Sequence, residues 1–282
     1  MVGAQLQRAI TGKSETFDLF SQSASMEDLG MLDPKKAVLE VTIAGRDFEI
    51  TQSPGMLQSQ RGGGTTGAAV WQSIVRFAEW LELSSNPLFR LGLLDATSVV
   101  LELGAGVSGI LPCILSKRVH KVVSTDQAYT LKALQNNIST NLRETRVSAK
   151  VKTSLPAIEV LPLDWETDDA LSFLRSAGLD SGVHMIVACD CIYNYALLAP
   201  FVQTCADLCR ARCHPSNTNE DPKAATLCVI VQQLRQSEVF DQWLAIFRQR
   251  FRVWRVPSNL LSRGLQEGSG FAVHVGIVRQ DS

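Results

Sequence analysis

The sequence predicts an α/β fold with a mostly parallel sheet of seven strands, an antiparallel edge hairpin and helices on both faces. From residue 98 onward, short apolar runs alternate with stretches of helical periodicity, which is typical of a parallel sheet. The last two apolar runs, 251–256 and 271–278, have no helical pattern between them and therefore predict an antiparallel hairpin. Two alternating runs joined by a turn predict a separate β-hairpin extension at residues 38–51.

The pattern places each element in order. Strands of the main sheet are expected at 98–103, 119–125, 158–163, 183–189, 227–233, 251–256 and 271–278. Helices are expected at 68–83, 108–117, 128–142, 168–176, 195–212 and 236–250. Residues 1–35 are polar and rich in small residues, so they are expected to form a flexible arm. Residues 36–97 would pack a hairpin and a helix on the core, and residues 98–282 would form the ligand-binding domain.

Composition limits the function classes. The chain has 282 residues, 45% of them hydrophobic, and a formal net charge of −1. These values are ordinary for a globular enzyme, and the charge gives no support for direct contact with nucleic acid. We expect no membrane partner, because no apolar run reaches the length of a membrane span and no signal-peptide pattern opens the chain. The seven cysteines are consistent with reduced thiols, so we expect a cytoplasmic and also a nuclear location. We also expect the protein to be a monomer.

The most informative segment is a strand, a glycine turn and a helix start at residues 99–109. The turn Gly104-Ala105-Gly106 has the Rossmann-like spacing that brings a ligand to the carboxyl edge of a sheet. Glu102 precedes it by two residues, and a carboxylate there suits a pyrophosphate poorly. S-adenosylmethionine (SAM) carries a sulfonium and an ammonium instead, so it fits better than NAD. The alternatives are a plain packing turn and an NAD-dependent oxidoreductase.

Two further strand ends supply groups for an adenosine. Asp126 ends the next strand, where its carboxylate can accept the ribose hydroxyls. It can also cap the following helix. Asp164 and Trp165 end the third strand, where the acid can accept the adenine amine and the indole can stack on the base. The alternative for Trp165 is packing at the rim of the core.

The fourth strand ends where the reacting atoms are expected. Cys189 is its last residue, and Asp190 and Tyr193 follow, an acid and a phenol that can orient an amine. The alternative for Tyr193 is packing over the strand end. Trp71 follows a glycine-rich joint, and it can belong either to a helix core or to a wall of the cofactor site.

A metal site is not expected. Cysteines recur at four-residue spacing at Cys205, Cys209 and Cys213, followed by His214. On a helix this stripe spans about 12 Å, too long for one ion to contact all of its members. Buried thiols of this kind behave as small apolar side chains.

Together these motifs resemble the family-16 seven-β-strand protein-lysine methyltransferases over roughly residues 36–280, and in particular a branch that acts on ribosomal proteins. The resemblance implies a SAM-binding methyltransferase domain at 98–282 and transfer to a lysine of a protein substrate, a ribosomal protein being expected. It implies catalytic roles for Asp190 and Tyr193. The cofactor would be held by Trp71, Glu102, Gly104, Ala105, Gly106, Asp126, Asp164, Trp165 and Cys189.

Other functions stay open at this point. Relatives act on elongation factors, chaperones or histidine, so the substrate protein is not fixed by the motifs. A SAM-binding module without chemistry and a small-molecule methyltransferase are the further alternatives. The sequence lacks the Asn/Asp-Pro-Pro-aromatic signature of enzymes that methylate amide or base nitrogens.

Overall fold

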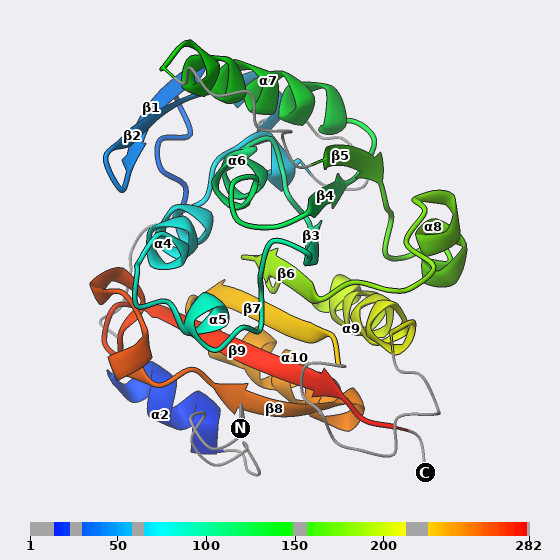
Figure 1. Cartoon of the computed structure of the whole chain (residues 1–282). Helices are drawn as coiled ribbons and strands as arrows, with labels where there is room; N and C mark the ends of the chain where they lie inside the picture. Colours follow the sequence, from blue (N-terminus) through cyan, green and yellow to red (C-terminus); the bar gives the residue numbers. More distant parts are fainter. Residues whose placement is uncertain (1–13, 23–29, 58–64, 149–156, 213–224, 281–282) are drawn as a thin grey trace.

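The structure, a computed structural model, describes residues 14–22, 30–57, 65–148, 157–212 and 225–280. Within these residues, seven strands form one sheet in the order β5-β4-β3-β6-β7-β9-β8 (Figure 1). The strands are β3 (Val99–Leu103), β4 (Lys121–Asp126), β5 (Ala157–Pro162), β6 (Met185–Cys189), β7 (Leu227–Gln233), β8 (Phe251–Arg255) and β9 (Phe271–Val278). The first five are parallel, and β9 pairs antiparallel with both β7 and β8. The predicted fold class is confirmed.

Helices cover both faces of the sheet because its central strands are apolar on both sides. In β7, Leu227, Val229 and Val231 pack on one face, whereas Cys228 and Ile230 pack on the other. The first face is covered by α4 (Gln72–Leu81), α6 (Ile110–Leu115) and α7 (Leu131–Ser148). The second is covered by α8 (Ala170–Ser176), α9 (Tyr195–Arg210) and α10 (Ser237–Arg250). Figure 1 shows these two helical layers on either side of the sheet.

The predicted hairpin extension is present as β1 (Val38–Ile43) and β2 (Arg46–Thr51), which pair antiparallel. Its β2 edge is closed by two side chains of α7, one helical turn apart. Asn137 exchanges hydrogen bonds with the backbone of Thr51, and Asn141 does the same with Glu49. These amides satisfy backbone groups that an edge strand otherwise leaves unpaired, which fixes the hairpin to the core.

The described part of the N-terminal arm differs from the expectation of flexibility, because it includes the helix α2 (Ser14–Gln22). Leu19 is buried in the core beside α10, and Thr16 donates a hydrogen bond to Asp241 at 2.9 Å. Glu15 contacts the buried His274 of β9 at 3.1 Å. A nine-residue helix with so few apolar positions depends on these tertiary contacts, which local sequence patterns do not reveal.

The helix expected at 68–83 begins only at Gln72, and the difference affects the site. Residues Thr66–Ala68 form a 3-10 turn, η1. Trp71 is extended and forms a β-bridge with Met31. The apolar spacing of this segment is therefore not helical throughout. Four short elements had no clear sequence signal: α3 (Pro54–Leu57), α5 (Pro87–Arg90), η2 (Ser258–Leu260) and η3 (Arg263–Leu265).

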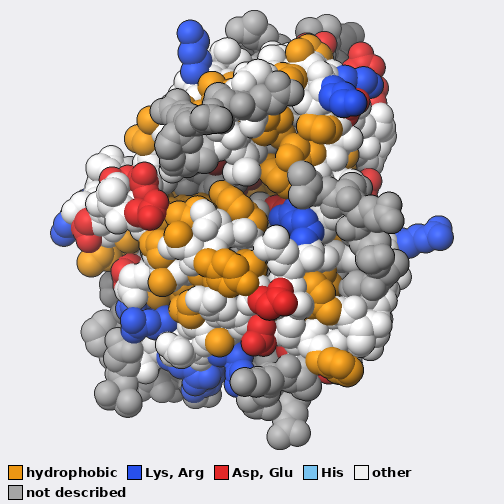
Figure 2. Space-filling model, turned by 180° about the vertical axis from the view of Figure 1, so that it is seen from behind, with side chains coloured by type: hydrophobic (Ala, Val, Ile, Leu, Met, Phe, Trp, Pro, Cys, Tyr) orange, Lys and Arg blue, Asp and Glu red, His pale blue; other side chains and the backbone are white. Residues whose placement is uncertain are grey.

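The surface carries both signs of charge. On the face shown in Figure 2, acidic and basic side chains are interspersed, and neither sign covers it. None of the helices in the described ranges is both long enough and apolar enough to cross a membrane.

Candidate active site

One cavity lies at the carboxyl ends of β3, β4 and β6 and beside the segment that precedes α4. All eleven residues that the sequence predicts for the site line it: Trp71, Glu102, Gly104, Ala105, Gly106, Asp126, Asp164, Trp165, Cys189, Asp190 and Tyr193. The sequence thus identified groups from five separate segments that meet in one place. Their individual roles stay predictions.

The glycine turn is required by close approach as well as by backbone conformation. Gly104 has φ +66°, and a Cβ there would lie 2.6 Å from Cys191 Sγ and 3.2 Å from the Trp165 ring. Gly106 has φ +58°, and its Cβ would lie 3.0 Å from the carbonyl oxygen of Gly67. Both values of φ favour glycine. The bare backbone of the turn therefore forms part of the cavity wall.

Asp126 joins the glycine turn to the start of the next loop. Its Oδ2 accepts the Gly106 N–H and its Oδ1 accepts the Gln127 N–H, each at 2.7 Å. Burial raises the pKa of the Asp126 carboxyl above its usual value, although these backbone hydrogen bonds oppose the rise. A carboxylate offers about four acceptor sites, so Asp126 keeps room for hydroxyl donors from the cavity. The geometry is compatible with the predicted ribose role.

Glu102 is a buried acid on the same face of the sheet as Val100. Ser124 of the neighbouring strand donates to its Oε2 at 2.6 Å. Burial raises its pKa to about 7, the Ser124 hydrogen bond lowers it, and the nearby Asp126 charge raises it further. A bound cation in the cavity would stabilise the ionised form, because an opposite charge offsets desolvation.

Trp165 lies beside the glycine turn, with its ring near Gly104 and 4.9 Å from the Phe201 ring centroid. Its buried Nε1 has no hydrogen-bond partner among the described residues. Asp164 accepts the Glu166 N–H at 2.9 Å through Oδ1, which fixes the turn after β5. Buried donors without a partner are uncommon in folded proteins.

The lining fits SAM and not a dinucleotide. It includes five carboxylates and, among the described residues, no lysine or arginine: the acids are Glu102, Asp126, Asp164, Glu166 and Asp190. Acceptors of this kind match hydroxyls, an amine and positive charge, whereas a pyrophosphate needs donors and cations. When bound, SAM supplies an electrophilic methyl group. Asp126 would hold the ribose, Glu102 would face the cationic portion, and Trp165 would contact the adenine.

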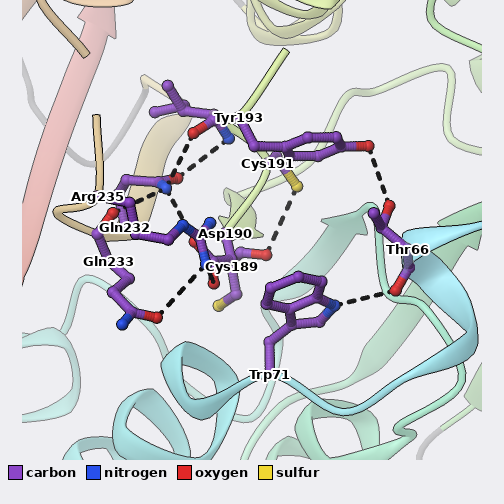
Figure 3. Close-up of polar contacts among 10 residues, drawn as sticks. Thr66, Trp71, Cys189, Asp190, Cys191, Tyr193, Gln232, Gln233 and Arg235 are labelled. Carbon is purple, nitrogen blue, oxygen red and sulfur yellow. Dashed lines mark hydrogen bonds and ion pairs between the residues drawn. The ribbon is translucent and has the colours of Figure 1, made fainter. Parts of the chain in front are cut away.

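Asp190 lines the cavity, but its side chain is buried and tightly held. Its φ is +61°, which is rare for a residue with a side chain. Arg235 contacts both carboxylate oxygens, Nη2 to Oδ1 at 2.6 Å and Nη1 to Oδ2 at 3.0 Å, and Gln232 donates to Oδ1 at 2.8 Å (Figure 3). Burial raises the pKa of the Asp190 carboxyl, and Arg235 lowers it. The sequence had suggested that this carboxylate faces a substrate amine, and the structure shows that its contacts are with Arg235 and Gln232.

Tyr193 lies at the cavity mouth, where it is 38% exposed. Its phenolic oxygen accepts a hydrogen bond from Thr66 Oγ1 at 3.2 Å, and the Thr66 carbonyl accepts the Trp71 indole N–H at 3.0 Å (Figure 3). Burial raises the pKa of Tyr193, so its hydroxyl is protonated at neutral pH. The extended conformation of Trp71 turns its indole to the cavity, which favours the wall over the helix core.

Sequence reasoning missed three residues around this site: Thr66, Gln232 and Arg235. Gln232 is buried at the end of β7, where it accepts the Ile192 N–H at 3.0 Å and donates to the Ile192 carbonyl at 3.0 Å. A signal was available, because polar residues that end a buried parallel strand lie at the same edge as the other strand ends.

The described cysteines of the four-residue stripe are part of the core. Cys205 and Cys209 of α9 are buried in the same apolar cluster as Cys228 of β7. Cys213 and His214 lie outside the described residues. Within the described ranges, no group of three or more His, Cys, Asp or Glu side chains is placed to hold a metal ion.

The seven-stranded sheet with its antiparallel edge, together with a glycine turn and an acidic cavity at the strand ends, defines a SAM-dependent methyltransferase. The sequence model described as lysine methyltransferase matches residues 51–218, and the chain belongs to this family. The protein is therefore a protein-lysine methyltransferase, which uses SAM and a protein substrate.

The individual relatives and solved structures that this chain resembles carry different names. Ribosomal lysine N-methyltransferase 5 of Vanderwaltozyma polyspora is 30% identical, and the alignment covers 88% of this chain and 90% of that one. A Schizosaccharomyces pombe protein named diaminohydroxyphosphoribosylamino-pyrimidine deaminase is 31% identical over 86% of this chain, which spans 52% of that protein. The solved structure of P. horikoshii TYW2 in complex with MeSAdo aligns with 86% of this chain and 71% of that one, with 13% identity and a TM-score of 0.41.

Proposed function

We propose that this enzyme transfers a methyl group from SAM to the side-chain amine of a lysine in a ribosomal protein. The observation that carries the chemical part is the single cavity in which the predicted cofactor residues and Tyr193 meet. The ribosomal substrate is supported by the relative of V. polyspora, which aligns over nearly its whole length. We further propose that the enzyme acts as a monomer in the cytoplasm, and also in the nucleus.

The site suits an acceptor amine that arrives without its proton. Lysine has a pKa near 10.4 in water, and desolvation of the amine lowers it. Tyr193 is protonated, so its hydroxyl can donate to or accept from a polar group of the substrate without acting as a strong base. The Asp190 charge is paired with Arg235, and the proposal gives it no direct contact with the incoming amine. Catalysis then rests mainly on alignment of the two reactants.

The experiment is incubation of the purified protein with ribosomes and methyl-labelled SAM. The ribosomes come from cells that lack this protein, so that the acceptor lysine is unmodified. We expect the label in one ribosomal protein, and peptide mass spectrometry should place it on lysine. An unlabelled ribosome would contradict the ribosomal substrate.

A parallel incubation with a ribosome-free extract of the same cells separates the other functions. Label on another protein would move the substrate to a different partner, and label on histidine would change the acceptor. Label only in the small-molecule fraction would contradict a protein substrate. SAM binding with no label in either sample would indicate a binding module.

A further inference from the structure

Five side chains form a closed circuit around the cavity mouth. Asp190 pairs with both guanidinium nitrogens of Arg235, whose Cζ lies 5.1 Å from the Trp71 ring centroid. Trp71 donates to the Thr66 carbonyl, and Thr66 donates to the Tyr193 hydroxyl. Tyr193 is connected to Asp190 through the two intervening residues of the chain. We call these five residues the mouth circuit (Figure 3).

The mouth circuit includes residues of three different loop segments. Asp190 and Tyr193 follow β6, Arg235 follows β7, and the remaining two members precede α4. Figure 3 shows Arg235 on one side of the cavity residues and Thr66 on the other. Gln232 already bonds the loop after β6 to β7, and the mouth circuit adds the connection from both of these loops to the segment before α4.

Arg235 is the member on which the circuit depends. The Asp190 side chain is 1% exposed and that of Arg235 is 14% exposed, so water screens their attraction weakly. Arg235 makes two parallel hydrogen bonds to the carboxylate while the same guanidinium contacts an aromatic ring, a combination that a lysine ammonium does not reproduce. Asp190 also has an unusual backbone conformation, with φ of +61°, and its N–H donates to the Val231 carbonyl at 2.8 Å.

We propose that Arg235 is a positioning residue for methyl transfer. By pairing with Asp190 and covering Trp71, it sets the place of Tyr193 at the acceptor side of the cavity. Asp190 accordingly serves as the anchor of the loop 190–193 and not as a binding group for the target amine. The proposal rests on the methyltransferase function proposed above. It gives a role to Arg235, which does not line the cavity.

The first test measures the contact between Arg235 and Trp71 by NMR and requires no activity assay. In cofactor-free protein labelled with ¹⁵N, the indole N–H signal of Trp71 is assigned by its absence in Trp71→Phe. We expect Arg235→Met and Arg235→Lys to shift this signal, because both alter the group over the ring. The control is Arg118→Met, which removes an arginine stacked on Phe89 near the amino end of β4, at the opposite edge of the sheet. An unchanged Trp71 signal in both Arg235 variants would overturn the proposal.

The second test separates transfer from cofactor binding. At saturating SAM and saturating substrate, Arg235→Lys should lower kcat at least tenfold, while the Kd for SAM measured by calorimetry changes by less than threefold. This variant keeps the positive charge beside Asp190. It therefore remains informative if Arg235→Met fails to fold. A normal kcat in Arg235→Lys would overturn the proposal, and so would a loss of SAM affinity as large as the loss of kcat.

A double-mutant cycle distinguishes the anchor role of Asp190 from a direct role. If Asp190 acts through Arg235, then Asp190→Asn, Arg235→Gln and the double variant should lose similar fractions of kcat. If Asp190 binds the amine directly, the two losses should multiply, and that result would overturn its role as anchor. Should the wild-type enzyme label no acceptor, the proposed function fails, whereas the Trp71 signal still decides whether Arg235 organises the mouth.

Discussion

The carboxylate of Asp126 accepts a hydrogen bond from the backbone N–H of Gly106, with 2.7 Å between Oδ2 and N. This contact connects the end of β4 to the glycine turn after β3, so the cofactor wall is built by two neighbouring strands. The same carboxylate keeps acceptor capacity for a ligand. The interaction therefore links the shape of the turn to the affinity of the cavity.

Asp126→Ala should weaken SAM binding by about 10- to 100-fold. It removes charged hydrogen bonds that contribute about 1.5–3 kcal/mol and leaves the Gly106 N–H without its acceptor. Calorimetry of SAM binding measures the effect. Asp207→Ala is the control, because this acid pairs with Arg210 on α9 and does not line the cavity. Equal affinity in wild type and Asp126→Ala would contradict the ribose role.

Glu102→Gln should change the pH dependence of stability. The folded-state pKa of Glu102 is raised from 4.5 to about 7, so folding favours its neutral form. Its contribution to stability is therefore present below pH 4.5 and is lost as pH rises to 7, a loss of about 3 kcal/mol at pH 8. The glutamine stays neutral, so the variant should unfold at a higher denaturant concentration than wild type at pH 8 and at a similar one at pH 4.5. If the denaturation midpoints of the two proteins differed by the same amount at every pH, the pKa of Glu102 would not be raised in the folded protein.

Gly104→Ala should abolish measurable SAM binding. The new Cβ would meet Cys191 Sγ at 2.6 Å and would hold a left-handed backbone angle that alanine disfavours. Adding Cys191→Ala removes the sulfur and should restore part of the thermal stability, since the backbone strain remains. Scanning calorimetry follows the stability of both variants. Normal SAM affinity in Gly104→Ala would mean that the turn does not border the cofactor.

Tyr193→Phe should reduce kcat about tenfold or more and leave the Kd for SAM unchanged. The phenol lies at the mouth, and its hydrogen bond is to Thr66 and not to a cofactor-wall carboxylate. Thr66→Val removes the other partner and should produce a smaller loss, because the hydroxyl of Tyr193 remains. Steady-state kinetics at saturating SAM compares the two. Full activity of Tyr193→Phe would assign the residue to packing.

Leu19→Ala should lower the free energy of unfolding by about 2–3 kcal/mol without changing SAM affinity. Leu19 is the buried apolar residue by which α2 packs beside α10, and it does not line the cavity. Phe17→Ala is the matched control in the same helix, because Phe17 is 74% exposed. Urea denaturation measures both. A change no larger than that of Phe17→Ala would mean that α2 adds little to the fold.

The sheet could be predicted because its strands are apolar on both faces and its helices are periodic, so each element carries its own signal. The cofactor residues could be predicted for a related reason. Glu102 lies near the end of β3, Asp126 ends β4 and Asp164 follows β5, and the carboxyl ends of parallel strands meet at one edge.

Arg235, Thr66 and the helix α2 depend instead on contacts between residues distant in sequence. Arg235 acquires its partner only when β7 is placed beside β6, and Thr66 reaches Tyr193 only when the segment before α4 folds across the mouth. The local hydrophobic pattern of the sequence does not predict such contacts between distant residues. The position of β9 between β7 and β8 could not be predicted for the same reason, because strand order depends on tertiary contacts.

The most direct test of the central claim is amino-acid analysis of the methylated product. Wild-type enzyme, methyl-labelled SAM and unmodified ribosomes are incubated together, the labelled protein is hydrolysed, and its amino acids are separated against N-methyl-lysine and methyl-histidine standards. The account predicts label in N-methyl-lysine and at least a tenfold lower yield with Tyr193→Phe at saturating SAM. Label in another amino acid, or none in protein while SAM still binds, would contradict it.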